Sequence, residues 1–256
     1  MDIADKIGER PSRKKVDREA RRQRILDAAF LLIEEKGVHG MSLHQLAKHL
    51  GYTVGALYRY FSSKDALIAE LQSSSLEKLG AAMGLALGRG RAFVEAESME
   101  SRLAPLFLMR LLVDFYEAHA HVSPAHFRLS SLVMAETDNV LKGEEALRVF
   151  GTIQETLLHP VGLVMEGVEQ GAFSEGNHVE RVMLLWASLH GVMQSRKLAR
   201  FAPDMLQRDR LVPALSCTMM QGWGALETDL RKADTYLQTF VEQNPLVELA
   251  EEASAE

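Results

Sequence analysis

Cysteine, tryptophan and proline are scarce in this chain of 256 residues, which has one cysteine, two tryptophans and seven prolines. The single cysteine, Cys217, excludes an intramolecular disulfide and a cysteine cluster for a metal, and suits a reducing compartment. Arg110 interrupts the apolar runs 106–109 and 111–113, and the N-terminus lacks the apolar segment of a secretory signal. We therefore expect a cytoplasmic protein without a membrane partner.

Composition and charge indicate a globular chain with two unlike parts. Hydrophobic residues make up 47% and charged residues 25%, which is ordinary for a soluble protein, and the length exceeds that of one typical domain. Residues 1–70 hold 13 Lys and Arg against 10 Asp and Glu, whereas the remainder holds 16 against 25. The positive charge gathers between Arg10 and Arg24, where DNA could approach, although a solvated tail is the alternative explanation.

The segment 42–64 has the pattern of a helix-turn-helix. Ser42 and Gln45 have the spacing of a capping box, which predicts a helix over 43–50. Gly51 follows this helix, where a left-handed turn needs a residue without a Cβ atom.

Two more helices are predicted after that turn. Thr53 can cap a helix over 54–61, and Ser63 can cap another that begins at Lys64. Short helices joined by such a turn match the arrangement that places a recognition helix in the major groove of DNA.

Many positions between Arg21 and Leu71 coincide with one known pattern. They are ILDAA at 25–29, the turn at Lys36 and Gly37, and then Ser42, Leu46, Ala47, Leu50, Gly51, Leu57, Tyr58, Phe61, Lys64 and Leu67. This stretch resembles the N-terminal part of the TetR/AcrR (tetracycline repressor) family of bacterial regulators. The resemblance implies an all-α fold, with an N-terminal three-helix helix-turn-helix DNA-binding domain and a C-terminal helical ligand-binding and dimerisation domain.

We divide the chain into a basic flexible arm (1–16), the DNA-binding domain (17–70), the effector-binding and dimerisation domain (71–242) and a loose acidic tail (243–256). Helix 1 is expected over 17–36. Glycine and proline positions divide the rest into predicted helices over 65–87, 101–120, 125–138, 144–158, 160–171, 177–199 and 207–231, with 232–242 as a continuation of the last.

The residues expected to contact DNA are Arg21, Ser42, Thr53, Val54, Gly55, Ala56, Tyr58, Arg59 and Lys64. Helix starts favour phosphate, so Ser42, Thr53 and Lys64 are expected to position the backbone, with capping alone as the alternative for the first two. Arg21, or Arg22 in its place, also faces phosphate. Arg59 is the expected base reader, because a guanidinium can donate two hydrogen bonds to guanine.

An effector pocket is expected between the helices of residues 101–199, where methionine and aromatic side chains could line an adaptable apolar site or simply build the core. The expected lining residues are Phe107, Met109, Phe115, Tyr116, Phe127, Met134, Met165, Trp186 and His190. We expect a small apolar effector.

Two long helices, over 177–199 and 207–231, carry methionine and tryptophan on a broad apolar face. The residues concerned are Met183, Met193, Met219, Met220 and Trp223. They could belong to the internal core, but the family resemblance implies a four-helix bundle with a second copy and therefore a homodimer. A dimer also suits a palindromic site, in which two recognition helices meet major-groove faces about 34 Å apart.

These features predict a homodimeric transcriptional regulator, a repressor that leaves double-stranded operator DNA when its effector binds, with no catalytic residue, metal or cofactor. Two other classes stay open: an all-helical metal-dependent enzyme and a nonspecific DNA architectural protein. His119, His121 and His126 are the candidate metal ligands, but positions i and i+2 of a helix point to different faces. We expect Cys217 to be a buried, inert thiol.

Overall fold

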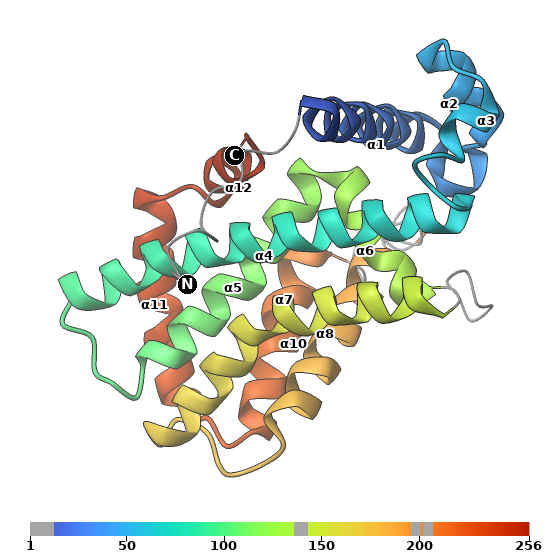
Figure 1. Cartoon of the computed structure of the whole chain (residues 1–256). Helices are drawn as coiled ribbons and strands as arrows, with labels where there is room; N and C mark the ends of the chain where they lie inside the picture. Colours follow the sequence, from blue (N-terminus) through green and yellow to red (C-terminus); the bar gives the residue numbers. More distant parts are fainter. Residues whose placement is uncertain (1–12, 136–142, 196–200, 202–206, 256) are drawn as a thin grey trace, which may run out of the picture. The chain divides into compact units, whose positions relative to one another are not determined.

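The computed structural model describes residues 13–135, 143–195, 201 and 207–255, and every regular element within these ranges is a helix (Figure 1). The all-α class is therefore confirmed. By its internal contacts the chain divides into two compact units, Met1–Leu71 and Gln72–Glu256. Within the described ranges no helix combines the length and apolar character needed to cross a bilayer.

The N-terminal unit consists of α1 (Arg13–Gly40), α2 (Leu43–Leu50), α3 (Val54–Leu57) and the first turns of α4 (Lys64–Ala96). Regular helix geometry in α1 is interrupted at Gly37, which has φ 74° and ψ 168°, at the predicted end of helix 1. Residues 13–16 are the first turn of α1 and not part of a flexible arm; the rest of the expected arm lies outside the described residues. One apolar stripe of α1 is buried, and it comprises Ile25, Ala28, Ala29, Leu32 and Ile33.

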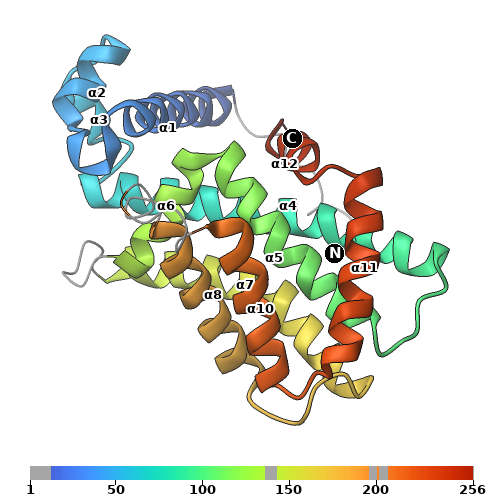
Figure 2. The ribbon, with the colours of Figure 1, turned by 180° about the vertical axis from the view of Figure 1, so that it is seen from behind.

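The C-terminal unit is organised around one almost fully buried helix, α5 (Ala104–Val122). Helix α5 contacts the elements that surround it, which are α6 (Pro124–Ala135), α7 (Glu144–Glu169), α10 (Arg208–Gly222), α11 (Glu227–Gln243) and α12 (Leu246–Ala255). Helix α8 (His178–Gln194) packs against α7 and α10. In Figure 2, α5 lies between α10 and α11.

Several predicted helix boundaries in this unit are wrong. Helix α4 continues through the glycines at 88 and 90, and α7 continues through Pro160. A Cβ atom at Gly90 would lie 2.6 Å from Cδ2 of Leu111, so this glycine allows α5 to pack closely. Conversely, the expected helix 207–231 is interrupted by Gly224, whose φ of 105° separates α10 from α11.

The expected loose acidic tail is also wrong, because most of it forms α12. Leu249 and Ala250 of this helix are buried in a cluster with Phe115 of α5. Its acidic side stays exposed, and Glu252 accepts a 2.7 Å hydrogen bond from Arg89. The apolar residues follow helical spacing, a local signal that the acidic composition of the segment obscured.

Candidate nucleic-acid interface and ligand cavity

Side-chain caps define both helices of the helix-turn-helix. The backbone N–H of Gln45 donates to Oγ of Ser42, and the backbone N–H of Ser42 donates to Oε1 of Gln45, each at 3.2 Å. Gly51 ends α2 in the left-handed conformation, with φ 67°. The N–H of Ala56 donates to Oγ1 of Thr53 at 3.2 Å. The predicted caps are confirmed, while phosphate contact by these residues remains a prediction.

Helix α3 is shorter than predicted, since it ends at Leu57 and continues as a turn. The N–H of Phe61 still donates to the carbonyl of Leu57 at 3.0 Å, and both side chains are buried. Because these two side chains point inward, the opposite side of the turn faces outward. On that side Tyr58 is 53% exposed and Arg59 is also exposed. Within the part of the chain that the structure describes, Arg59 makes no ion pair.

The remaining expected DNA contacts differ in exposure. Gly55 is exposed, whereas Val54 and Ala56 are half-buried. Lys64 is half-buried at the start of α4, and the Ser63 hydroxyl caps that helix by accepting from the N–H of Ala66 at 2.9 Å.

The two candidate arginines of α1 have different surroundings. Arg21 is exposed. Arg22 pairs with Glu70 of α4 and lies over the ring of Phe61, so its guanidinium is engaged within the N-terminal unit. This favours Arg21 as the phosphate contact.

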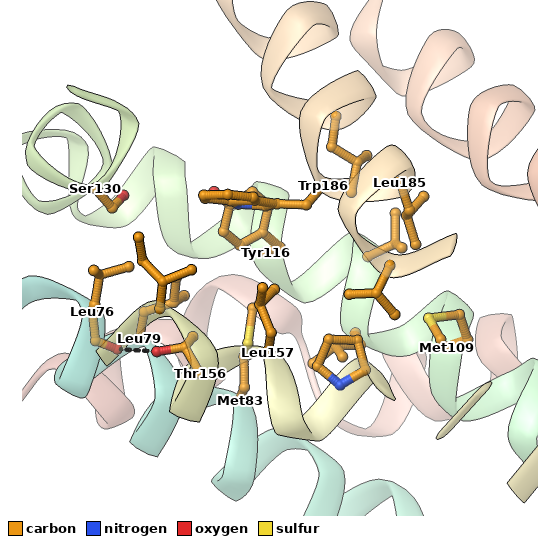
Figure 3. A pocket seen from close by; sticks show the side chains of 16 residues that line it. Leu76, Leu79, Met83, Met109, Tyr116, Ser130, Thr156, Leu157, Leu185 and Trp186 are labelled. Carbon is orange, nitrogen blue, oxygen red and sulfur yellow. Dashed lines mark hydrogen bonds between the residues drawn. The ribbon is translucent and has the colours of Figure 1, made fainter. Parts of the chain in front are cut away.

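A largely apolar cavity of about 50 Å³ lies in the C-terminal unit among α4, α5, α6, α7 and α8 (Figure 3). Its lining residues are Leu76, Leu79, Met83, Met109, Leu112, Val113, Tyr116, Ser130, Ile153, Thr156, Leu157, Pro160, Val182, Leu185, Trp186 and Leu189. None of these side chains is charged. Pockets for drug-sized ligands measure about 300–1,000 Å³, so a larger ligand requires flexible side chains such as Met83 and Met109 to move.

Three of the expected pocket residues, Met109, Tyr116 and Trp186, line this cavity. Two others lie behind it, because His190 hydrogen-bonds to Tyr116 and Phe127 stacks on the His190 ring with centroids 5.3 Å apart.

Of the other expected pocket residues, Phe107, Phe115 and Met165 do not line this cavity. Phe107 packs among aromatic rings of the core, 5.4 Å from Phe93 and 5.8 Å from Phe240 between centroids. Phe115 faces α12, and Met165 is 45% exposed. The side chain of Met134 lies outside the described residues.

Sequence reasoning missed the contributions of α4 and α7 to the cavity. Leu76, Leu79 and Met83 lie one helical turn apart along α4, and Thr156 and Pro160 lie one turn apart on α7. The signal for α4 is the apolar spacing of Leu76, Leu79 and Met83, which by itself indicates only a buried helix face. Pro160 had been interpreted as a helix break.

One group of polar side chains at the cavity lies around Tyr116. Its hydroxyl is 3.1 Å from Nε2 of His190, whose Nδ1 is 3.2 Å from the carbonyl oxygen of Trp186. Burial raises the pKa of Tyr116, partly opposed by a hydrogen bond from the Trp186 indole, and burial lowers the pKa of His190. Both groups are therefore neutral at physiological pH.

A buried ionic network lies elsewhere in the unit. Nε of Arg110 donates to Oδ1 of Asp234 at 2.9 Å, and the same guanidinium contacts Ser216 and Asp114. Burial raises the pKa of Asp114 to about 6, and the positive charge of Arg110 opposes this shift. Burial also raises the pKa of the half-buried Cys217 thiol, which disfavours the reactive thiolate.

Two of the three candidate metal ligands, His119 and His126, occupy structural positions, whereas His121 is exposed. His119 is buried and stacks on Phe115, while Nδ1 of His126 lies 2.9 Å from Oγ of Ser75. Burial lowers the pKa of His126 to about 4, with a smaller contribution from Lys78. Among the described residues no three His, Cys, Asp or Glu side chains come together as a metal site.

The methionines and tryptophan expected at a dimer interface are divided between core and surface. Met193, Met220 and Trp223 are buried within the chain's own core, so the expectation for these three is wrong. Met219 is half-buried against the core, and Met183 is 37% exposed.

Comparison with known proteins identifies the N-terminal unit. Residues 25–71 match the family model of bacterial regulatory proteins of the tetR family. The HTH-type transcriptional regulator PksA of Bacillus subtilis is 39% identical over 66 residues, which cover 26% of this chain and 32% of PksA. The nucleoid occlusion factor SlmA of Haemophilus influenzae is 36% identical over 86 residues, which cover 32% of this chain and 39% of SlmA. The chain thus spans about a third of the length of these relatives.

Solved structures resemble the chain over most of its length. RolR in complex with resorcinol matches with a TM-score of 0.55 and 15% identity, covering 85% of this chain and 94% of RolR. A Rhodococcus sp. RHA1 protein of unknown function matches with a TM-score of 0.53 and 25% identity, covering 79% and 94%. The RolR likeness concerns the fold alone. Residues 25–71 of this chain therefore form a segment of the kind found in bacterial regulatory proteins of the tetR family.

Proposed function

We propose that this chain is a dimeric transcriptional repressor that binds a palindromic operator through α2 and α3 and is released by a small ligand in the C-terminal cavity. The observation that carries the proposal is the capped helix-turn-helix, in which Leu57 and Phe61 are buried while Tyr58 and Arg59 are exposed. This arrangement suits a short recognition helix that inserts its outer side into a groove.

The proposed contacts fall into two groups. Arg59 reads a guanine, and Tyr58 contacts either a base or the backbone beside it. Arg21, Lys64 and the two capping residues of α2 and α3 contact phosphates, because positive charge and helix N-termini both attract anions. Val54, Gly55 and Ala56 allow close approach to the groove and offer only small or apolar surface.

The proposed dimer face lies on the outer side of α8 and α10. Val179, Met183 and Leu184 of α8 are 56%, 37% and 54% exposed. Exposed small residues, Gly191 of α8 and Ala214 of α10, permit another helix to approach closely. Burial of these groups against the same helices of a second copy forms a two-fold interface.

Helix α4 supports the proposed coupling between ligand and DNA. Its residues Leu76, Leu79 and Met83 line the cavity, and the same continuous helix begins at Lys64, directly after the recognition segment. A ligand that displaces these side chains biases the position of α4 and thereby the spacing of the two recognition helices. Ligand and DNA then weaken each other's binding reciprocally, typically by about 1–3 kcal/mol.

The experiment that tests the proposal is selection of DNA by the purified protein from random duplexes, followed by a measurement of stoichiometry. The expected result is enrichment of one palindrome that binds two protomers. Leu184→Glu should dissociate the dimer and abolish this binding, whereas Leu147→Glu, at an exposed position of α7, should do neither. Retention of all duplexes alike, with steep loss in salt, would instead favour an architectural protein. Turnover that is lost on chelation would favour the enzyme.

A further inference from the structure

The hydroxyl groups that line the cavity donate their hydrogen bonds to backbone carbonyls or to His190. Oγ1 of Thr156 lies 2.9 Å from the carbonyl oxygen of Thr152 and 3.2 Å from that of Leu76. Oγ of Ser130 donates to the carbonyl of Phe127 at 3.0 Å. Because a carbonyl oxygen only accepts, both hydroxyls must donate to the backbone and can offer the cavity only lone pairs.

The donor and the acceptor can also be assigned in the hydrogen bond between Tyr116 and His190. Nδ1 of His190 lies 3.2 Å from the Trp186 carbonyl, so this nitrogen carries the hydrogen of the neutral ring. Nε2 is then an acceptor, and the Tyr116 hydroxyl, 3.1 Å away, donates to it. The phenol oxygen consequently presents acceptor capacity at the cavity.

The described lining residues offer a single side-chain N–H against these acceptors. It belongs to Trp186. Pro160 has no backbone N–H, which leaves the Thr156 carbonyl without its usual helical donor. In Figure 3 the Tyr116 and Trp186 side chains lie together on one side of the cavity, and Met109 lies on the other.

We propose that the cavity binds a neutral, mostly apolar molecule that carries one hydroxyl or N–H donor, and that this donor binds the oxygen of Tyr116. The ligand class rests on the proposed role of the cavity as the effector site. A carboxylate or phosphate is excluded, because the lining has no cation, and one indole N–H cannot replace the water that the anion loses. An ammonium ion would likewise lack a counter-charge.

The test is isothermal titration of the full chain with three probes of one shape: p-cresol, p-xylene and p-toluate. They place a hydroxyl, a methyl group and a carboxylate at the same ring position. We expect p-cresol to bind about three- to tenfold more tightly than p-xylene, the gain of one net hydrogen bond, and p-toluate to show no binding. In Tyr116→Phe, the affinity for p-cresol should fall to the affinity for p-xylene, while the affinity for p-xylene should stay unchanged. Tyr236→Phe, a matched change outside the cavity, should preserve the preference.

The inference is wrong if p-cresol fails to bind, if p-toluate binds as well as p-cresol, or if Tyr116→Phe keeps the preference for p-cresol. The order of the three probes in the wild-type chain decides the question even where the variant does not fold. These titrations contain no DNA. Binding in the expected order without release of the selected operator therefore contradicts the repressor proposal and leaves the ligand class intact.

Discussion

Nη1 of Arg22 on α1 lies 2.7 Å from Oε1 of Glu70 on α4, and the same guanidinium is 5.3 Å from the centroid of the Phe61 ring. The Arg22 and Glu70 side chains are only 29% and 20% exposed. The pair therefore joins α1 to the start of α4. It does so beside Phe61, one of the two buried side chains that anchor the turn after α3. Arg21, the preceding residue, is exposed and makes no such contact with the described residues.

Arg22→Ala should lower the free energy of unfolding by about 1–2 kcal/mol, because it removes a partly buried ion pair and a cation–π contact. Arg21→Ala should change this free energy by less than about 0.5 kcal/mol but weaken DNA binding. Urea unfolding and DNA titration of both variants measure the difference. Equal stability of the two variants would contradict the structural role of Arg22.

Arg59→Ala should cost about 1–3 kcal/mol of binding free energy on the selected operator and relax the preference at one base pair. Arg59→Lys keeps the charge and removes the two-pronged donor, so it should retain affinity for scrambled DNA and lose the base preference. Competition titrations against single-base operator variants provide the measurement. If Arg59→Ala keeps the wild-type preference at every position, Arg59 does not read a base.

Lys64→Ala should weaken binding to operator and scrambled DNA by the same factor, because a phosphate contact carries no sequence information. The slope of log K against log salt should become shallower by about 1. Titrations over a series of salt concentrations test both effects together. A changed base preference with an unchanged salt slope would show that Lys64 does not act on phosphate.

The raised pKa of Asp114 predicts a pH dependence of stability. Burial holds this pKa at about 6 in the native protein, above the ordinary 3.8, so the native state binds the proton more tightly than the unfolded chain. The stabilisation from this group is complete below pH 3.8 and is lost as the pH rises to about 6, with an upper limit of about 3 kcal/mol. Asp114→Asn should remain neutral, so its stability relative to wild type should increase over this range. Urea unfolding measures the free energy of unfolding of both proteins at each pH. If the two free energies changed in parallel with pH, the raised pKa of Asp114 would be contradicted.

Two glycines of α7 should respond oppositely to alanine. A Cβ atom at Gly167 would lie 2.2 Å from a ring carbon of Phe173, whereas one at the exposed Gly162 would meet nothing within 4 Å. Gly167→Ala should therefore destabilise the protein by about 1–3 kcal/mol through overpacking. Gly162→Ala should stabilise it by up to about 1 kcal/mol through helix propensity. Thermal unfolding compares them, and equal shifts would contradict the close contact at Gly167.

The N-terminal unit was predictable because its signals are local. The capping box of Ser42 and Gln45, the left-handed Gly51 and the cap at Thr53 each depend on residues within one or two turns. Caps and turns formed by residues so close in the chain can be recognised from the sequence alone. The end of α3 at Leu57 was missed, because the following turn keeps the same apolar spacing as a helix.

The C-terminal unit depends on contacts that are distant in sequence. Glycine and proline usually break helices, but packing against other helices keeps α4 continuous through Gly90 and α7 continuous through Pro160. The cavity likewise joins side chains of α4 to side chains of α7, some 80 residues later. Methionine and aromatic content alone did not distinguish cavity from core, as Phe107 and Trp186 illustrate.

The most direct test of sequence-specific DNA binding is fluorescence-anisotropy titration of the purified protein against its selected palindrome at physiological salt, with scrambled competitor. A dimeric repressor should show saturable binding by two protomers that scrambled DNA displaces only at about 10³-fold or greater excess. Displacement by equal amounts of scrambled and palindromic DNA would contradict it, because the exposed side of α3 would then read no sequence.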